Sequence, residues 1–116
     1  PICRGPDLAA ALRAVPRDAP RVVLSHNPVT FDDTAQHCAL QLSGHTHGGQ
    51  INTAGVAGLG LRYISGFYQR ADSLLFVSNG LGITGPPVRL SAPAEVVLLG
   101  LTGRAGRGVR PGALPA

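Results

Sequence analysis

Two short apolar runs flank a polar stretch with helical character in the first half of the chain. Residues 21–25 and 39–43 are rich in valine and leucine, which is typical of buried strands. Between them, residues 30–37 carry Asp32 and Asp33 where the first turn of a helix would lie, and acidic side chains are favourable there. The sequence therefore predicts a compact βαβ unit with two parallel strands.

The same pattern predicts three further elements. Asp7 can cap a helix over residues 8–15, and Pro16 would end that helix. Apolar runs at 74–78 and 95–101 predict two more strands, the first of them followed by an Asn-Gly turn signal. Strands that alternate with helices indicate an α/β fold.

Length and composition fit one domain with a modest core. The chain has 116 residues, 44% hydrophobic and 14% charged, which suits a sheet covered by helices. Residues 1–102 are expected to form the domain, with an irregular excursion where glycines occur at 55, 58 and 60. Residues 103–116 are rich in glycine, arginine and proline and are expected to be a disordered tail.

The net charge of +4 does not indicate a nucleic-acid-binding surface. Arg104, Arg107 and Arg110 lie in the tail, the chain contains no lysine, and basic residues do not alternate with aromatic ones. No specific nucleic-acid binding is expected. Cys3 and Cys38 follow no metal or redox spacing and are expected to be reduced thiols. No apolar run is long enough to span a membrane. Localisation stays open: the protein could be cytoplasmic or anchored through a segment outside these residues.

The histidines carry the candidate chemistry. His26 follows the first predicted strand, and His45 and His47 follow the second, within Leu-Ser-Gly-His-Thr-His-Gly-Gly-Gln at 42–50. Parallel strands end at one edge of a sheet, so the three imidazoles should converge there, His45 and His47 on one face if the extended backbone continues. Three imidazoles could hold one transition-metal ion and leave a position open for water. His37 falls late in a predicted helix and is interpreted as structural.

These segments resemble a known family. Val-Leu-Ser-His-Asn-Pro at 23–28 and the string at 42–50 look like the last two metal motifs of the calcineurin-like metallophosphoesterases. Gly-Leu-Gly at 80–82 and Gly-Pro-Pro-Val-Arg-Leu at 85–90 resemble the end of a branch whose members often carry an N-terminal membrane anchor. The resemblance covers residues 7–101.

The resemblance implies an α/β fold, the C-terminal half of a two-sheet sandwich with flanking helices. It implies two divalent transition-metal ions (Mn, Fe, Zn or Co), with His26 and His45 on one ion and His47 on the other. Members of the family hydrolyse phosphomonoesters or phosphodiesters by attack of a metal-activated hydroxide at a dinuclear site.

Five further residues are candidates for contacts around such a site. Asn27 and Gln50 could orient metal ligands or substrate. Gly48 and Gly49 would let a phosphate approach the backbone closely. Arg89 could contact phosphate or could be a solvated surface residue, and the sequence leaves both interpretations open.

The family's other ligands do not occur in these 116 residues, which contain no Asp-x-His, Gly-Asp or Gly-Asn-His segment. We therefore expect this chain to supply the histidine half of the site, with a missing N-terminal half of the domain as its partner. Without a bridging carboxylate two cations would repel strongly, so the chain alone should hold one ion weakly or none and should be inactive. The alternative is a non-catalytic module that binds a single metal or serves as a partner surface.

Overall fold

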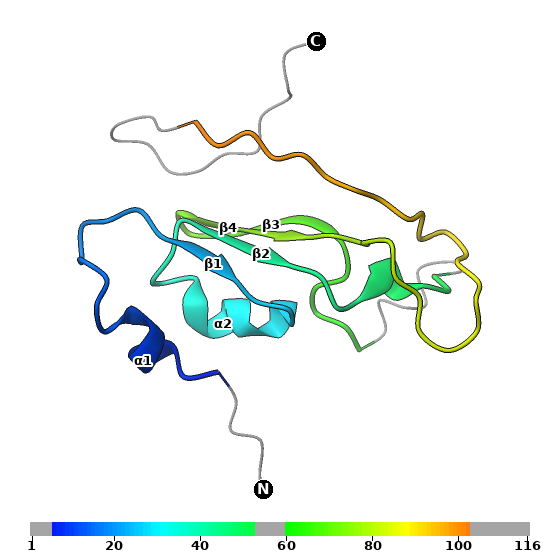
Figure 1. The fold of residues 1–116 in the computed structure, drawn as a ribbon, viewed down its shortest axis with the longest axis horizontal. Coiled ribbons are helices and arrows are strands. Elements are labelled where there is room, and N and C mark those ends of the chain that lie inside the picture. Colours follow the sequence, from blue (N-terminus) through cyan, green and yellow to red (C-terminus); the bar gives the residue numbers. More distant parts are fainter. Residues whose placement is uncertain (1–5, 53–59, 103–116) are drawn as a thin grey trace, which may run out of the picture.

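The computed structural model describes residues 6–52 and 60–102. Within them a single four-stranded sheet forms, in the order β1-β2-β4-β3, with β3 antiparallel to its neighbour and the other pairs parallel (Figure 1). The helices are short. The elements in chain order are α1 (Leu8–Leu12), β1 (Val22–Leu24), the 3₁₀ turn η1 (Pro28–Thr30), α2 (Phe31–Thr34), β2 (Leu40–Ser43), the 3₁₀ turn η2 (His47–Gly49), β3 (Gly66–Arg70) and β4 (Ser73–Val77).

The predicted βαβ unit is confirmed. β1 and β2 pair in parallel, with Val22 opposite Leu40, and β4 continues the parallel arrangement on the far side of β2. The helical segment between them is predicted at residues 30–37. In the structure it runs from Pro28 to Thr34, as η1 followed directly by α2. η1 begins at Pro28, whose fixed φ suits a first helical position, and the Asn27 side chain accepts the amide proton of Val29.

One face of the sheet packs against α2. Phe31 of α2 is buried against Leu75 and Val77 of β4, and Tyr63 and Tyr68 close the side of this cluster. The aromatic rings meet edge to face, with centroids 6.0 Å apart for Phe31 and Tyr63 and 5.0 Å apart for Tyr63 and Tyr68. This cluster is the hydrophobic core of the described residues.

A buried polar network lies on the same face. Gln41 of β2 has no exposed surface, and its side chain accepts from Thr34 and donates to Thr30 and Ser43, the last two at 3.0 Å. Thr30 in turn donates to Ser25, at 2.8 Å, just before the His26 loop. These hydrogen bonds satisfy the buried polar groups, and they join β2 to the turn that follows β1.

The opposite face of the sheet leaves apolar side chains in contact with solvent at both edges. Leu24 of β1 is 78% exposed, and Phe67 of β3 is 45% exposed although it packs on Phe76 with centroids 4.7 Å apart. Within the described residues no second sheet covers this face. The helices therefore cover one side only, as expected for part of a layered α/β fold.

The hairpin of β3 and β4 was anticipated only in its second strand. β4 matches the prediction at 74–78 to within one residue, whereas β3 was not predicted. The two strands are joined by Ala71 and Asp72, and Ala71 adopts a positive φ of 51°. Because this turn uses alanine where glycine or asparagine is usual, the turn signal is absent from the sequence.

Two other expectations are corrected. The predicted strand at 95–101 is an extended segment with no strand partner among the described residues (orange in Figure 1). Helix α1 is capped by Asp7 as predicted, yet it ends at Leu12 instead of residue 15. The tail at 103–116 and the glycines at 55 and 58 lie outside the described residues. No helix within 6–52 or 60–102 is long and apolar enough to cross a membrane.

Candidate functional site

The carboxyl ends of β1 and β2 open into a cleft of about 750 Å³. His26, His45 and His47 all line it, so the structure brings the three predicted imidazoles to one place. The parallel pairing of the strands explains this, because both strands deliver their following loops to the same edge. Gln50, from the same loop, also lines the cleft.

His26 and His45 form a close pair. The Nδ1 atom of His45 lies 3.1 Å from the Nε2 atom of His26, and the rings meet edge to face with centroids 4.8 Å apart. Two nitrogens that each lie about 2.0–2.1 Å from one zinc-sized ion are themselves roughly 3 Å apart at common bond angles. The donor set and spacing of this pair therefore fit a shared transition-metal ion, and both residues are exposed to solvent.

His47 is held in one tautomer. Its Nδ1 atom lies 2.8 Å from the carbonyl oxygen of Gly82. A carbonyl oxygen can only accept, so Nδ1 carries the proton and Nε2 of the neutral ring keeps a lone pair. An imidazole whose second nitrogen donates to a carbonyl is the usual arrangement of a metal-ligating histidine.

The three imidazoles do not form one compact cluster. No group of three or more histidine, cysteine or acidic side chains gathers closely enough to hold a metal ion in the part of the chain that the structure describes. His26 and His45 are paired, and His47 turns toward Gly82. The division of the three histidines between two ions, which the family resemblance implies, stays a prediction.

The loop that carries the histidines is strained, and the expected continuation of an extended strand is wrong. His45, His47 and Gln50 have positive φ angles of 71°, 54° and 45°, and Gly48 and Gly49 have angles of 64° and 81°. Non-glycine residues rarely adopt this conformation, and such strain gathers at functional sites. Because β2 ends at Ser43, the strand's alternation does not set the directions of the two imidazoles.

Gly48 is confined by its surroundings. A Cβ atom at this position would lie 2.5 Å from Oδ1 of Asn79 and 3.2 Å from the Cβ of Ala92. Together with the positive φ, this explains why the sequence has glycine there. Gly48 is buried and Gly49 is half-buried, so only the latter lines the cleft.

The side-chain amides of Gln50 and Asn27 form hydrogen bonds with backbone groups. The Gln50 side chain donates to the carbonyls of Thr84 and Pro86, at 2.7 and 3.1 Å, and accepts from the Thr84 amide at 2.8 Å. Gln50 therefore fastens the segment around residue 85 across the cleft. The oxygen of the Asn27 side chain caps η1, which leaves the exposed amide nitrogen of Asn27 beside His26.

Arg89 holds backbone and does not face the cleft. Its two terminal nitrogens donate to five carbonyl oxygens, and its Nε is buried without a partner. All four terminal N–H groups are thus engaged by backbone carbonyls. Arg89 therefore acts neither as a phosphate contact nor as a solvated surface residue in this geometry, the two interpretations that the sequence leaves open. One of the five carbonyls, that of Gly82, also accepts from His47. The five carbonyls belong to His47, Asn79, Gly80, Gly82 and Ala92.

A cluster around Asp32 was not anticipated from the sequence. Its carboxylate accepts from Tyr63 at 2.8 Å, from Arg62 at 2.6 Å and from Arg70 at 3.3 Å. The hydrogen bond from Tyr63 is the main cause that lowers the pKa of Asp32, and both arginines lower it further. Burial raises the pKa of the Tyr63 hydroxyl. No local motif marks these residues, because they meet only through the fold.

The fold and the site together define an α/β domain with three histidines at the carboxyl edge of its parallel strands. A transmembrane protein with metallophosphoesterase domain from Bos taurus is 38% identical over 100 residues, which are 82% of this chain and 22% of that protein. An uncharacterized metallophosphoesterase of Campylobacter jejuni is 36% identical over 104 residues, 85% of this chain and 27% of that protein. An uncharacterized metallophosphoesterase of Bacillus subtilis is 36% identical over 86 residues, which are 69% of this chain and 30% of that protein.

This chain therefore belongs to the metallophosphoesterases. It spans about a quarter of the length of these curated relatives. No model of a protein family and no solved structure matches it.

Proposed function

We propose that this chain supplies the histidine side of a dinuclear centre that hydrolyses phosphoesters. The observation that carries the proposal is the set of imidazole nitrogens in one cleft: Nε2 of His26 and Nδ1 of His45, 3.1 Å apart, and Nε2 of His47. The names of the relatives support the hydrolase family, and the reaction and metal are our inference.

The chain's own residues would do three things at such a site. The neutral rings of His26 and His45 would bind one ion, and Nε2 of His47 would face the other. Two ions held there neutralise phosphoryl charge and lower the pKa of a water molecule. Gln50 would keep the segment at 84–86 in place beside the cleft. Asn27 lines the neighbouring cavity and not the histidine cleft.

The metal-binding part can be tested on the chain itself. Zinc is added stepwise while the histidine ring nitrogens are followed by NMR. We expect Nε2 of His26 and Nδ1 of His45 to shift as they bind one weakly held ion, and His37, at the other end of the sheet, to stay unchanged. Binding should weaken as the solution is acidified, because the rings must be neutral to act as ligands. Shifts of His37 alone would refute the site.

The hydrolytic part needs the complete polypeptide that contains these residues. We expect it to release nitrophenol from bis-p-nitrophenyl phosphate with added manganese, and His45→Ala to reduce the rate at least a hundredfold. His37→Ala is the matched control, since it removes an imidazole outside the cleft. The 116-residue chain by itself should show no turnover. Robust activity from it would contradict our view that acidic ligands must come from elsewhere.

The second candidate is a non-catalytic module that binds one ion. It is favoured by the absence, within 6–52 and 60–102, of any acidic side chain grouped with the histidines. The stoichiometry of metal in the complete polypeptide distinguishes the two candidates. Two ions per chain support the hydrolase, and one ion with no hydrolysis supports the module.

A further inference from the structure

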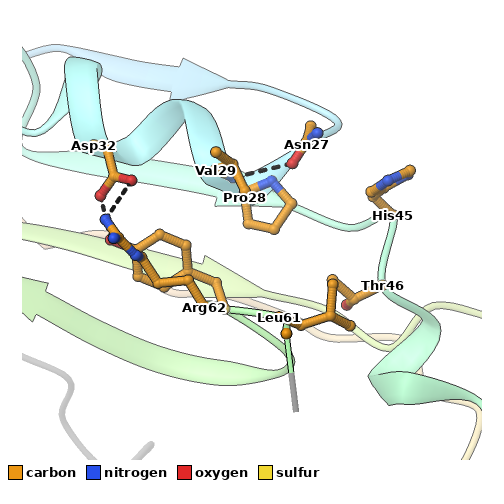
Figure 2. Close-up of a pocket in the computed structure, with 10 residues that line it drawn as sticks. Asn27, Pro28, Val29, Asp32, His45, Thr46, Leu61 and Arg62 are labelled. Atoms are coloured by element: carbon orange, nitrogen blue, oxygen red, sulfur yellow. Dashed lines mark hydrogen bonds and ion pairs between the residues drawn. The ribbon is translucent and has the colours of Figure 1, made fainter. Parts of the chain in front are cut away.

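A second cavity, of about 320 Å³, lies beside the histidine cleft (Figure 2). The two cavities share His45, Thr46 and Leu61, so they adjoin at the residue that pairs with His26. A molecule with one end at the histidines can therefore extend into this second space, which we name the side pocket.

The walls of the side pocket are mainly apolar. Pro28 and Val29 of η1 form one wall, and Leu61 lies across from them (Figure 2). Tyr63 also lines the pocket. Val29 and Leu61 remain 51% and 44% exposed, although both are large hydrophobic residues. Exposed apolar side chains that face one another across a cavity are the usual lining of a small-molecule site.

The far end of the side pocket is built from fixed polar groups. The Arg62 guanidinium donates to Asp32 at 2.6 Å, and the Tyr63 hydroxyl donates to the same carboxylate at 2.8 Å. The Asp32 side chain is itself held by Arg70 at 3.3 Å. These bonds fix the wall before any ligand binds, which lowers the entropic cost of binding.

We propose that the side pocket binds the organic group of the phosphoester whose phosphoryl group lies at the histidines. The lining favours an apolar group, and the volume is near the lower end for small-molecule pockets, which fits a group the size of one aromatic ring. A sugar, with a hydroxyl on most carbons, would leave those hydroxyls without partners along Pro28, Val29 and Leu61. The inference rests on the proposed function, because it takes the phosphoryl position from it.

The test uses two phosphonates, whose carbon–phosphorus bond is not hydrolysed. Phenylphosphonate carries one ring, and methylphosphonate carries the same anionic group without it. Each is added to the zinc-loaded complete polypeptide that contains these residues, while NMR follows the methyl groups of Val29 and Leu61 and the ring protons of His26, His45 and His47. We expect both compounds to shift the histidine signals and only phenylphosphonate to shift the two methyl-bearing residues.

The possible results separate the two proposals. Shifts at the histidines with both compounds, and none at Val29 and Leu61, would overturn the side pocket and leave the proposed function standing. Shifts at Val29 and Leu61 without any at the histidines would show a pocket unconnected to the phosphoryl position and overturn the inference. No shift at either place would overturn both proposals.

A pair of variants checks the result. Val29→Trp fills the side pocket from an exposed turn, so the fold should tolerate it, as a dispersed NMR spectrum will confirm. We expect it to weaken phenylphosphonate binding at least fivefold and to change methylphosphonate binding less than twofold. Val15→Trp, at an exposed position away from both cavities, should change neither. Equal effects of Val29→Trp on both compounds would contradict the proposal.

Discussion

Substitution of Gly48 by alanine should be the most damaging single-methyl change in the histidine loop. The backbone at Gly48 has a φ of 64°, which costs an L-residue about 1–2 kcal/mol. The added Cβ would also lie 2.5 Å from Oδ1 and 2.8 Å from Cγ of Asn79, and overpacking of this kind costs about 1–3 kcal/mol. Alanine also lowers the conformational entropy of the unfolded chain, which stabilises the folded state by about 0.4–1 kcal/mol. We expect Gly48→Ala to lower the free energy of unfolding by about 2–4 kcal/mol.

Two other glycines allow the contributions to be separated by urea denaturation. Gly85 has a φ of 71° with nothing within 4 Å of an added Cβ, so Gly85→Ala measures the backbone cost alone, about 1 kcal/mol. Gly44 has an open environment and no positive φ, so Gly44→Ala should be neutral or slightly stabilising. The difference between Gly48→Ala and Gly85→Ala, about 1–3 kcal/mol, is the steric part.

Removal of the opposing side chain tests the steric part directly. In the background of Asn79→Ala, the Gly48→Ala substitution no longer meets Oδ1 and Cγ, and its cost should fall toward that of Gly85→Ala. This variant also provides a measurement if Gly48→Ala alone does not fold. If Gly48→Ala and Gly85→Ala agree within about 0.5 kcal/mol, the packing around Gly48 described above is incorrect.

Two further predictions concern the α2 face of the sheet. Because the pKa of Asp32 is lowered in the folded state, its carboxylate contributes stability above its unfolded pKa of about 3.9, and that contribution is lost as the pH falls through the folded pKa. As the pH is lowered from 6 to 3, the urea midpoint should therefore fall less in Asp32→Asn than in the parent. Asp33→Asn, at an exposed neighbouring position, should follow the parent. Parallel curves of midpoint against pH for all three proteins would refute the linkage. Gln41→Leu should cost about 3 kcal/mol, because it leaves the hydroxyls of Thr34 and Ser43 unpaired in a buried place. Gln69→Leu, at an exposed position of β3, should stay within about 0.5 kcal/mol, and an equal cost for both would contradict the network.

The parts of the fold that could be predicted from sequence are those encoded locally. The valines and leucines of β1 and β2 and the helical stretch between them are enough to specify a parallel pair, and so the edge at which the histidine loops meet. β3 was missed because its sequence, Gly-Phe-Tyr-Gln-Arg, shows weak alternation and its turn lacks glycine. The strand at 95–101 was wrongly predicted because an apolar run forms a strand only where a neighbour offers hydrogen bonds.

The candidate site shows the same division. The motif strings located His26, His45 and His47 in one cleft, because spacing along the chain and strand direction suffice for that. The tautomer of His47 depends on the carbonyl of Gly82, which is 35 residues away in sequence. The Asp32 cluster joins residues 30 to 38 positions apart. Contacts of that range are set by tertiary packing and leave no pattern in the sequence.

The hydrogen bonds from Arg89 to five backbone carbonyls have a consequence for comparing members of this family. A lysine at this position would keep the positive charge but offer three N–H donors to five oxygens, and it lacks the planar fork that spans them. Exchange between the two basic residues should therefore be disfavoured during evolution, for an architectural reason. An alignment that retains arginine here would be misread if that persistence were taken as a sign of contact with phosphate.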